Sequence, residues 1–195
     1  MFPLIISYYT KDTSYQLDAH HLVASCEKFG IEHHVEGIDS YGSWELNCAY
    51  KPFFIAEKLR QFERPVLWVD VDAIFVQKPR PLKVFEKDLV VYSQPGLDNA
   101  HPSKVRSGTL YVNHTEGGAG LLKAWAEECQ RLLIDPQRTE EFWDQIALRN
   151  VVLSHAQKKL GRLPLSYIKI LGHPNDAKCK NPIILHLQAS RRAKT

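Results

Sequence analysis

Apolar residues recur along this chain in two periods, which predict alternating strands and helices. Alternating or continuous apolar runs predict strands at 4–9, 31–35, 66–72, 88–92, 108–113, 167–171 and 183–187. Stripes with a spacing of three or four residues predict helices at 15–29, 52–62, 115–133 and 140–150. The opening strand–helix–strand order is typical of a βαβ unit. We therefore expect a single α/β domain over residues 1–195, with a mostly parallel central sheet flanked by helices.

The third predicted strand ends in two carboxylates, Asp70 and Asp72. Residues i and i+2 of a strand point to the same side, and open α/β sheets bind ligands at the carboxyl ends of their strands. Two carboxylates on one side repel each other unless a cation or a shared proton lies between them. Such oxygen ligands suit Mg²⁺ or Mn²⁺. The alternative is a solvated turn that simply ends the strand.

Composition excludes several classes of protein. The chain is 44% hydrophobic, which is enough for one buried core, and its net charge is only +3. The basic residues do not alternate with aromatic residues as they do in a nucleic-acid groove, so we expect no nucleic-acid partner. The four cysteines form no Cys-x-x-Cys pair, which argues against a zinc site or a disulfide framework.

No stretch of the sequence predicts insertion into a membrane. The first residues lack the basic flank of a signal peptide, and no apolar run approaches the roughly 20 residues that span a bilayer. We expect a cytoplasmic protein without a transmembrane segment. Association with a membrane surface, where an acceptor could reside, is compatible with this expectation.

Six motifs, in this order along the chain, together resemble the GT-A family of nucleotide-sugar-dependent glycosyltransferases. They are Tyr8-Tyr9-Thr10, Lys51-Pro-Phe-Phe54, Asp70-Val-Asp72, Ser107-Gly-Thr-Leu-Tyr-Val-Asn113, Asp144-Gln145 and His186-Leu-Gln-Ala-Ser-Arg191. The resemblance implies a single GT-A-like (Rossmann-like) domain. It also implies metal-dependent transfer of a sugar from a nucleotide-diphosphate sugar, with UDP as the default, to a glycan, lipid or protein acceptor.

The resemblance also implies a metal site. Asp72 would bind the ion directly, and Asp70 would hold the ribose or reach the ion through water. His186 corresponds to the family's late third ligand; the alternative is an ordinary strand histidine. A shell of oxygen and imidazole ligands favours Mn²⁺ over Mg²⁺.

The remaining donor contacts are implied in the same way. Tyr8, Tyr9 and Thr10 would lie at the base, where one tyrosine could stack, and Lys51 would contact the nucleotide or its phosphates. Ser107 and Asn113 are candidates for sugar hydroxyls, and Arg191 belongs to a basic flexible tail, residues 188–195, that could fold over the diphosphate. Each has an ordinary alternative: strand aromatics, a solvated lysine, backbone capping and a solvated tail.

Asp144 and Gln145 are the candidate catalytic residues. By resemblance their region faces the donor sugar and the acceptor hydroxyl. A Gln or Asp here lies near the anomeric carbon in retaining members, whereas in inverting members a carboxylate acts as general base. The Asp-Gln pair favours retention.

Two other functions compete with this hypothesis. A haloacid-dehalogenase-like phosphatase also carries a D-x-D after an apolar strand. That motif normally opens the domain, however, and the family needs a late pair of closely spaced aspartates, which this chain lacks. The second alternative is a GT-A-like module that binds a nucleotide or a protein without turnover.

Overall fold

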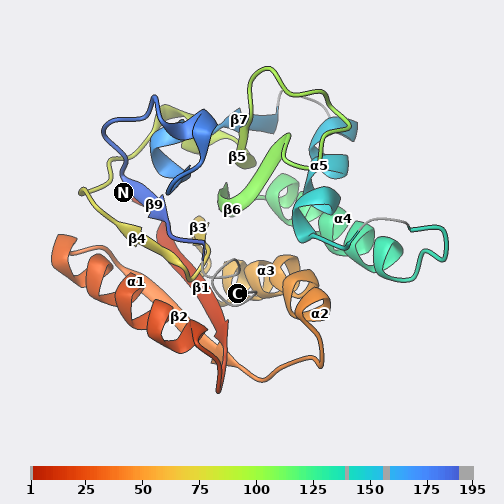
Figure 1. The fold of residues 1–195 in the computed structure, drawn as a ribbon, viewed down its shortest axis with the longest axis horizontal. Coiled ribbons are helices and arrows are strands. Elements are labelled where there is room, and N and C mark those ends of the chain that lie inside the picture. Colours follow the sequence, from red (N-terminus) through yellow and green to blue (C-terminus); the bar gives the residue numbers. More distant parts are fainter. Residues whose placement is uncertain (1, 139–140, 156–158, 189–195) are drawn as a thin grey trace.

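The computed structural model describes residues 2–138, 141–155 and 159–188 (Figure 1). Its elements are β1 Leu4–Thr10, α1 Tyr15–Phe29, β2 His33–Ile38, α2 Trp44–Ala49, α3 Lys51–Phe62, β3 Val66–Val69, β4 Ala73–Phe75, η1 Lys83–Glu86, β5 Leu89–Ser93, β6 Val105–Val112, α4 Glu116–Leu133, α5 Asp144–Ser154, β7 Leu160–Arg162, η3 Leu165–Tyr167, β8 Lys169–Ile170, η4 Pro174–Asp176 and β9 Ile184–His186.

The main sheet has six strands in the order β2-β1-β3-β6-β5-β7. The pairs β1–β2, β1–β3 and β5–β7 are parallel, whereas β6 runs antiparallel to both β3 and β5. The prediction of an α/β domain with a mostly parallel central sheet is confirmed. Strand β6 is the antiparallel member, and it returns the chain beside β3, at the centre of the sheet.

Both faces of the main sheet are buried, which explains its nearly continuous apolar strands. Leu4 and Ile6 pack on the side of α3, α4 and α5, while Ile5 packs on the side of α1 and β4. Figure 1 shows α1 on one side of the sheet and α3 and α4 on the other. The domain thus has helices on both faces, and its strand ends are left to form the site.

The sequence from 64 to 76 forms two strands in different sheets. Strand β3 ends at Val69, and a turn from Asp70 to Asp72, closed by the Ala73 N–H to Asp70 carbonyl bond of 3.0 Å, leads into β4. Strand β4 then joins a second sheet of order β4-β9-β8. The prediction that Asp70 and Asp72 share a strand face is therefore wrong. The turn, and not strand alternation, places these two carboxylates.

Several other boundaries differ from the sequence predictions. Strand β2 begins at His33, not at residue 31, and helix α5 begins at Asp144, not at residue 140. The expected loop 93–106 ends in the first residues of β6, and the expected strand 167–171 is shortened to β8. Helix α2 and strand β7 were not predicted. No helix among the described residues is both long enough and apolar enough to span a membrane.

Candidate active site

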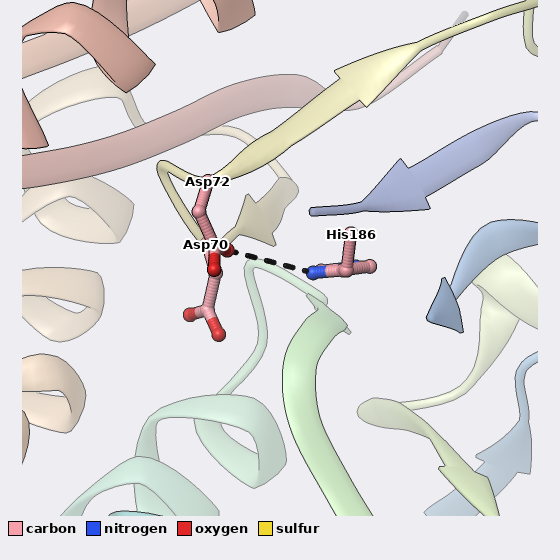
Figure 2. A group of neighbouring side chains, drawn as sticks. All are labelled: Asp70, Asp72 and His186. Carbon is pink, nitrogen blue, oxygen red and sulfur yellow. Dashed lines mark ion pairs between the residues drawn. The ribbon is translucent and has the colours of Figure 1, made fainter. Parts of the chain in front are cut away.

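Asp70, Asp72 and His186 converge although they come from two separate parts of the chain (Figure 2). Each offers a ligand atom, and these atoms lie within 4.8 Å of one another. The His186 Nδ1 atom is 3.9 Å from Asp72 Oδ1. Pairing of β4 with β9 places Ala73 opposite His186, and the Leu187 N–H donates to the Asp72 carbonyl at 2.9 Å. The second sheet therefore brings the late histidine beside the turn.

The donor set fits a divalent transition-metal ion. Nε2 of His186 lies 2.9 Å from the buried Thr109 hydroxyl, so a proton on Nε2 can be donated to Thr109 while Nδ1 faces the carboxylates. Burial lowers the pKa of His186, which favours the neutral ring that binds metals. Gly108 completes the space: a Cβ there would lie 2.9 Å from His186 Cε1 and 3.2 Å from Asp70 Oδ2.

Lys51 joins this cluster to a third carboxylate, that of Asp144. The Lys51 ammonium lies 2.9 Å from Asp70 Oδ1 and 2.9 Å from Asp144 Oδ2. Burial alone would lower the pKa of Lys51, but Asp144 and Asp70 raise it well above its usual value. Burial likewise opposes ionisation of Asp70, but Lys51 and His186 keep its pKa below the usual range. Lys51 is thus a buried, charged bridge.

Two adjoining cavities meet at these residues. The tyrosine cavity, of about 490 Å³, is lined by Tyr8, Tyr9, Thr10, Lys11, Thr13, Tyr15, Ser40, Gly42, Ser43, Trp44, Asn47, Cys48, Lys51, Trp68, Asp70, Val71, Asp72 and Asp144. The histidine cavity, of about 380 Å³, is lined by Trp44, Asp70, Asp72, Ser103, Arg106, Ser107, Gly108, Trp143, Asp144, Gln145, Ile168, Ile170, His173, His186 and Gln188. Both cavities are lined by Asp70, Asp72, Asp144 and Trp44. The three carboxylates therefore lie where the two cavities meet.

The tyrosine cavity contains all three residues that were predicted at the end of the first strand. The Tyr8 hydroxyl donates to the Asn47 carbonyl at 2.5 Å, and its ring packs on Trp68 with centroids 5.1 Å apart. Burial raises the pKa of Tyr8 well above its usual value. Tyr9 packs over Gly37, where a Cβ would lie 3.0 Å from the ring. Tyr8 is therefore part of the wall, and Tyr9 is the more available ring.

The histidine cavity contains the candidates for the sugar side. Gln145, in the first turn of α5, accepts weakly from the Ser107 N–H at 3.4 Å and donates to the Pro102 carbonyl at 3.1 Å. These bonds tie α5 to β6 and to the loop that precedes it. Asp144, beside Gln145, is buried and points to Lys51.

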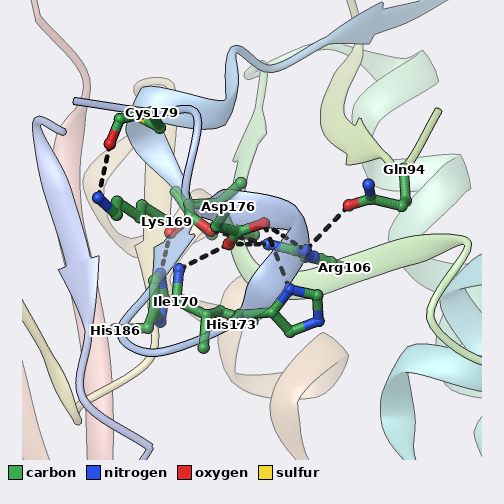
Figure 3. Close-up of polar contacts among 10 residues, drawn as sticks. Gln94, Arg106, Lys169, Ile170, His173, Asp176, Cys179 and His186 are labelled. Atoms are coloured by element: carbon green, nitrogen blue, oxygen red, sulfur yellow. Dashed lines mark hydrogen bonds and ion pairs between the residues drawn. The ribbon is translucent and has the colours of Figure 1, made fainter. Parts of the chain in front are cut away.

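Arg106 lines the histidine cavity and forms a buried ion pair with Asp176 behind it (Figure 3). Arg106 holds Asp176 through two bonds, Nη1 to Oδ2 at 2.6 Å and Nη2 to Oδ1 at 2.8 Å. Asp176 Oδ2 also accepts from the Ile170 N–H at 2.8 Å, and Ile170 pairs with His186 across β8 and β9. Burial opposes ionisation of Asp176, but the guanidinium keeps its pKa below the usual value. The pair thereby fastens the segment that carries His186 to β6.

Comparisons with known proteins identify a family and a similar fold. A family model described as nucleotide-diphospho-sugar transferase matches residues 51–194. The chain belongs to that family. A search of curated proteins finds no match. Among solved structures, the fold is similar to the crystal structure of a glycosyltransferase involved in the glycosylation of the major capsid of PBCV-1, with a TM-score of 0.73 and 15% identity. The match covers 100% of this chain and 97% of that one.

Family membership identifies this chain as a nucleotide-sugar glycosyltransferase, and the sequence resemblance is confirmed at that level. The structure brings together every predicted site residue that it describes except Asn113. That residue lies at the far end of β6, outside the linings of both cavities, where its N–H donates to the Asp88 carbonyl at 2.9 Å. Arg191 and the rest of the predicted tail beyond Gln188 lie outside the described residues.

Sequence reasoning missed four contributors to the site: Trp44, Arg106, Thr109 and Asp176. Gly108 and Thr109 stand inside the Ser107–Asn113 motif, so their position was a usable signal. Nothing in the sequence pairs Arg106 with Asp176, because that contact depends on how the second sheet docks. The alternative interpretation of Lys51 as an ordinary solvated lysine is wrong, because the residue is only 6% exposed.

Proposed function

We propose that this glycosyltransferase is metal-dependent and uses a UDP-sugar, with Mn²⁺ held by Asp70, Asp72 and His186. The observation that carries the proposal is the position of this cluster at the junction of two cavities. A nucleotide-diphosphate sugar has a charged diphosphate between two neutral ends. The cluster would meet the diphosphate, with the nucleoside in the tyrosine cavity and the sugar in the histidine cavity.

Each cavity suits the part of the donor assigned to it. A bound divalent cation stabilises the negative charge that builds on the leaving diphosphate. Tyr9 offers a ring for the base, and Thr10 closes the same end of the cavity. Ser107 and Gln145 offer polar groups on the sugar side. Water exclusion by the cavity walls would strengthen these polar contacts.

Asp144 and Gln145 are proposed as the residues nearest the reacting sugar. Asp144 is paired with Lys51 at 2.9 Å, so its oxygen is already engaged by a cation. A carboxylate that is already paired with a cation is a weak general base for the hydroxyl of the sugar acceptor. This pairing supports retention over an inverting mechanism with Asp144 as general base. NMR of the product anomer tests the assignment, and the opposite anomer would overturn it.

The two alternative functions lose support. A phosphatase of the haloacid-dehalogenase type has no basis in the family match, and a histidine beside the two carboxylates is not part of its D-x-D chemistry. An inactive binding module would not need the buried bridge between Asp70 and Asp144. Donor hydrolysis or transfer in the presence of Mn²⁺ would exclude it.

Thermal unfolding with a panel of nucleotides and nucleotide sugars, each with and without Mn²⁺, tests the proposal. A ligand that binds only the native state raises the melting temperature. We expect a shift that needs both Mn²⁺ and a uridine nucleotide and that disappears in Asp72→Ala. Glu127→Ala is a control that also removes one carboxylate, because Glu127 and its partner Lys123 are both exposed and neither lines a cavity. A shift that survives in Asp72→Ala would overturn the metal assignment.

The proposed location is the cytoplasm, which is compatible with a peripheral position at a membrane that carries the acceptor. All four cysteines, Cys26, Cys48, Cys129 and Cys179, are free thiols, as expected in a reducing compartment. Burial raises the pKa of Cys26 to about 12, so this thiol stays protonated and unreactive. Fractionation of cells that express the tagged chain tests the location.

A further inference from the structure

The position of Lys51 leaves little of its ammonium for phosphate binding. Its ammonium lies between two carboxylates, 2.9 Å from Asp70 and 2.9 Å from Asp144, and its side chain is only 7% exposed. It also stands 5.3 Å from the centroid of the Trp68 ring, in a cation–π arrangement. Two of the three N–H donors of the ammonium are thus engaged by carboxylates, which leaves at most one for a donor phosphate.

Lys51 instead controls how Asp70 is turned. Oδ1 of Asp70 accepts from the Trp68 indole N–H at 2.8 Å and pairs with Lys51. The other oxygen, Oδ2, lies 3.2 Å from the position of a Cβ on Gly108, on the side of His186. Lys51 and Trp68 together therefore fix which oxygen of Asp70 is presented to the metal cluster.

The same ammonium fixes the start of α5. Asp144 is the first residue of that helix, and its side chain is 9% exposed. Like charges repel when no cation lies between them, so without Lys51 the carboxylates of Asp70 and Asp144 would turn apart. A shift of Asp144 would also move Gln145, whose bonds to Ser107 and Pro102 hold the sugar side of the site.

We infer that Lys51 is a positioning residue that locks Asp70 and Asp144 into one arrangement and acts on turnover through Asp144. The inference rests on the proposed function, because it takes Asp70 as part of the metal site and Asp144 as part of the sugar site. It assigns Lys51 no direct contact with the donor.

Lys51→Met separates this role from phosphate binding. In this variant the Trp68 indole N–H still holds Asp70 Oδ1. If Lys51 acts on turnover through Asp144, the dissociation constants of Mn²⁺ alone and of UDP with Mn²⁺ therefore stay within about threefold of wild type, while turnover falls about 100-fold. If Lys51 binds the phosphates, the dissociation constant of UDP rises by about tenfold or more while that of Mn²⁺ alone is unchanged. The second result would overturn the inference. Calorimetry gives both constants without any turnover.

Lys58→Met is the matched control. Lys58 lies on the same helix and is equally buried, and it pairs with Glu36 at 2.6 Å and Glu57 at 2.9 Å. It lines neither cavity. We expect Lys58→Met to lower the melting temperature but to leave turnover and UDP binding unchanged. Equal losses of turnover in both variants would mean that Lys51 acts only through stability, which would also overturn the inference.

A double-mutant cycle with Asp144→Asn tests the route through Asp144. If Lys51 acts through Asp144, Lys51→Met causes no further loss of turnover in the Asp144→Asn background, whereas independent roles would give additive losses. Lys51→Arg keeps a cation and should restore part of the turnover. Lys51→Met alone could fail to fold, because it leaves the carboxylates of Asp70 and Asp144 without this cation. In that case, UDP binding is compared between Asp144→Asn and the double variant, which has lost one positive and one negative charge.

The wild-type protein distinguishes failure of this inference from failure of the proposed function. A wild type that binds neither Mn²⁺ nor a nucleotide overturns the function itself. A wild type that binds and turns over, with additive losses in the cycle or weakened UDP binding in Lys51→Met, overturns only the role of Lys51.

Discussion

Gly108 and His186 lie so close together that position 108 has no room for a side chain. A Cβ there would stand 2.9 Å from His186 Cε1 and 3.2 Å from Asp70 Oδ2. The φ angle of Gly108 is not in the left-handed region, so space and not backbone conformation requires the glycine. Gly108 is therefore the residue that leaves the two ligands of the proposed metal site open toward each other.

Gly108→Ala should block metal binding without removing any ligand. The added methyl group separates Asp70 from His186, and we expect Mn²⁺ affinity to fall by more than about tenfold. Overpacking should also cost about 1–3 kcal/mol of folding stability. Calorimetric titration with Mn²⁺ measures the first effect, and urea unfolding measures the second.

Gly120→Ala is the control for that variant. Gly120 lies on the exposed side of α4 with nothing within 4 Å of an added Cβ, so alanine should raise helix stability by up to about 1 kcal/mol. Its Mn²⁺ affinity should equal that of the wild type. Undiminished Mn²⁺ binding in Gly108→Ala would show that the ion does not lie between Asp70 and His186.

Thr109→Val should weaken the proposed metal site through His186. The Thr109 hydroxyl lies 2.9 Å from His186 Nε2, and its removal leaves a buried ring nitrogen without this partner. Loss of such a supporting bond typically costs about 10–100-fold in metal affinity. Tyr111→Phe on the same strand removes a hydroxyl that donates to the Phe85 carbonyl, away from both cavities, and should change stability alone. Equal Mn²⁺ affinities in the two variants would contradict the role of Thr109.

The sequence predicted the elements that follow from local pattern. The continuous apolar run at 66–69 is buried on both faces as β3, and Gly30, with a φ of 61°, ends α1 where expected. Thr115 caps α4 by accepting from the Gly118 N–H at 3.0 Å. Helix α2 was missed because it has only six residues, too few for a periodic signal. Caps, helix stops and apolar runs of this kind can be recognised from a few neighbouring residues alone.

The site was only partly predictable, because most of its geometry is non-local. The residue types Asp70, Asp72 and His186 could be selected by their chemistry and by resemblance. Their meeting, however, depends on β4 leaving the main sheet and pairing with β9, which no local pattern specifies. The burial of Lys51 likewise depends on where α5 begins, four residues later than its apolar spacing suggested.

Acid should weaken the ion pair between Arg106 of β6 and Asp176, which holds the segment that pairs with the His186 strand. Asp176 is fully buried and paired with Arg106, and its pKa in the folded state lies below the unfolded value of about 3.9. Its contribution is therefore complete above that value and is lost as the pH falls through the folded pKa. Asp176→Asn should cost about 3–5 kcal/mol at pH 7, because it leaves a buried guanidinium unpaired.

Urea unfolding of wild type and Asp176→Asn across the acid range checks this expectation. The difference in free energy of unfolding should be constant above about pH 5 and should shrink below about pH 4, where Asp176 of the wild type becomes protonated. Asp39→Asn breaks the exposed pair with Lys11 and should change little at any pH. A difference that stays constant down to the lowest pH would show that the Asp176 charge does not stabilise the fold.

The division of the donor between the two cavities predicts opposite effects for Tyr9 and Gln145, because each lines only one of them. Tyr9→Ala removes the ring that we assign to the base, and loss of stacking on a base costs about 1–3 kcal/mol, so UDP should bind more weakly. Gln145→Ala should leave UDP binding within about threefold of wild type and lower turnover by about tenfold or more, because the residue lies on the sugar side. Calorimetry with UDP and Mn²⁺, followed by release of UDP from the donor, separates the two effects. The reverse result, with UDP binding sensitive to Gln145 and not to Tyr9, would place the nucleoside in the histidine cavity.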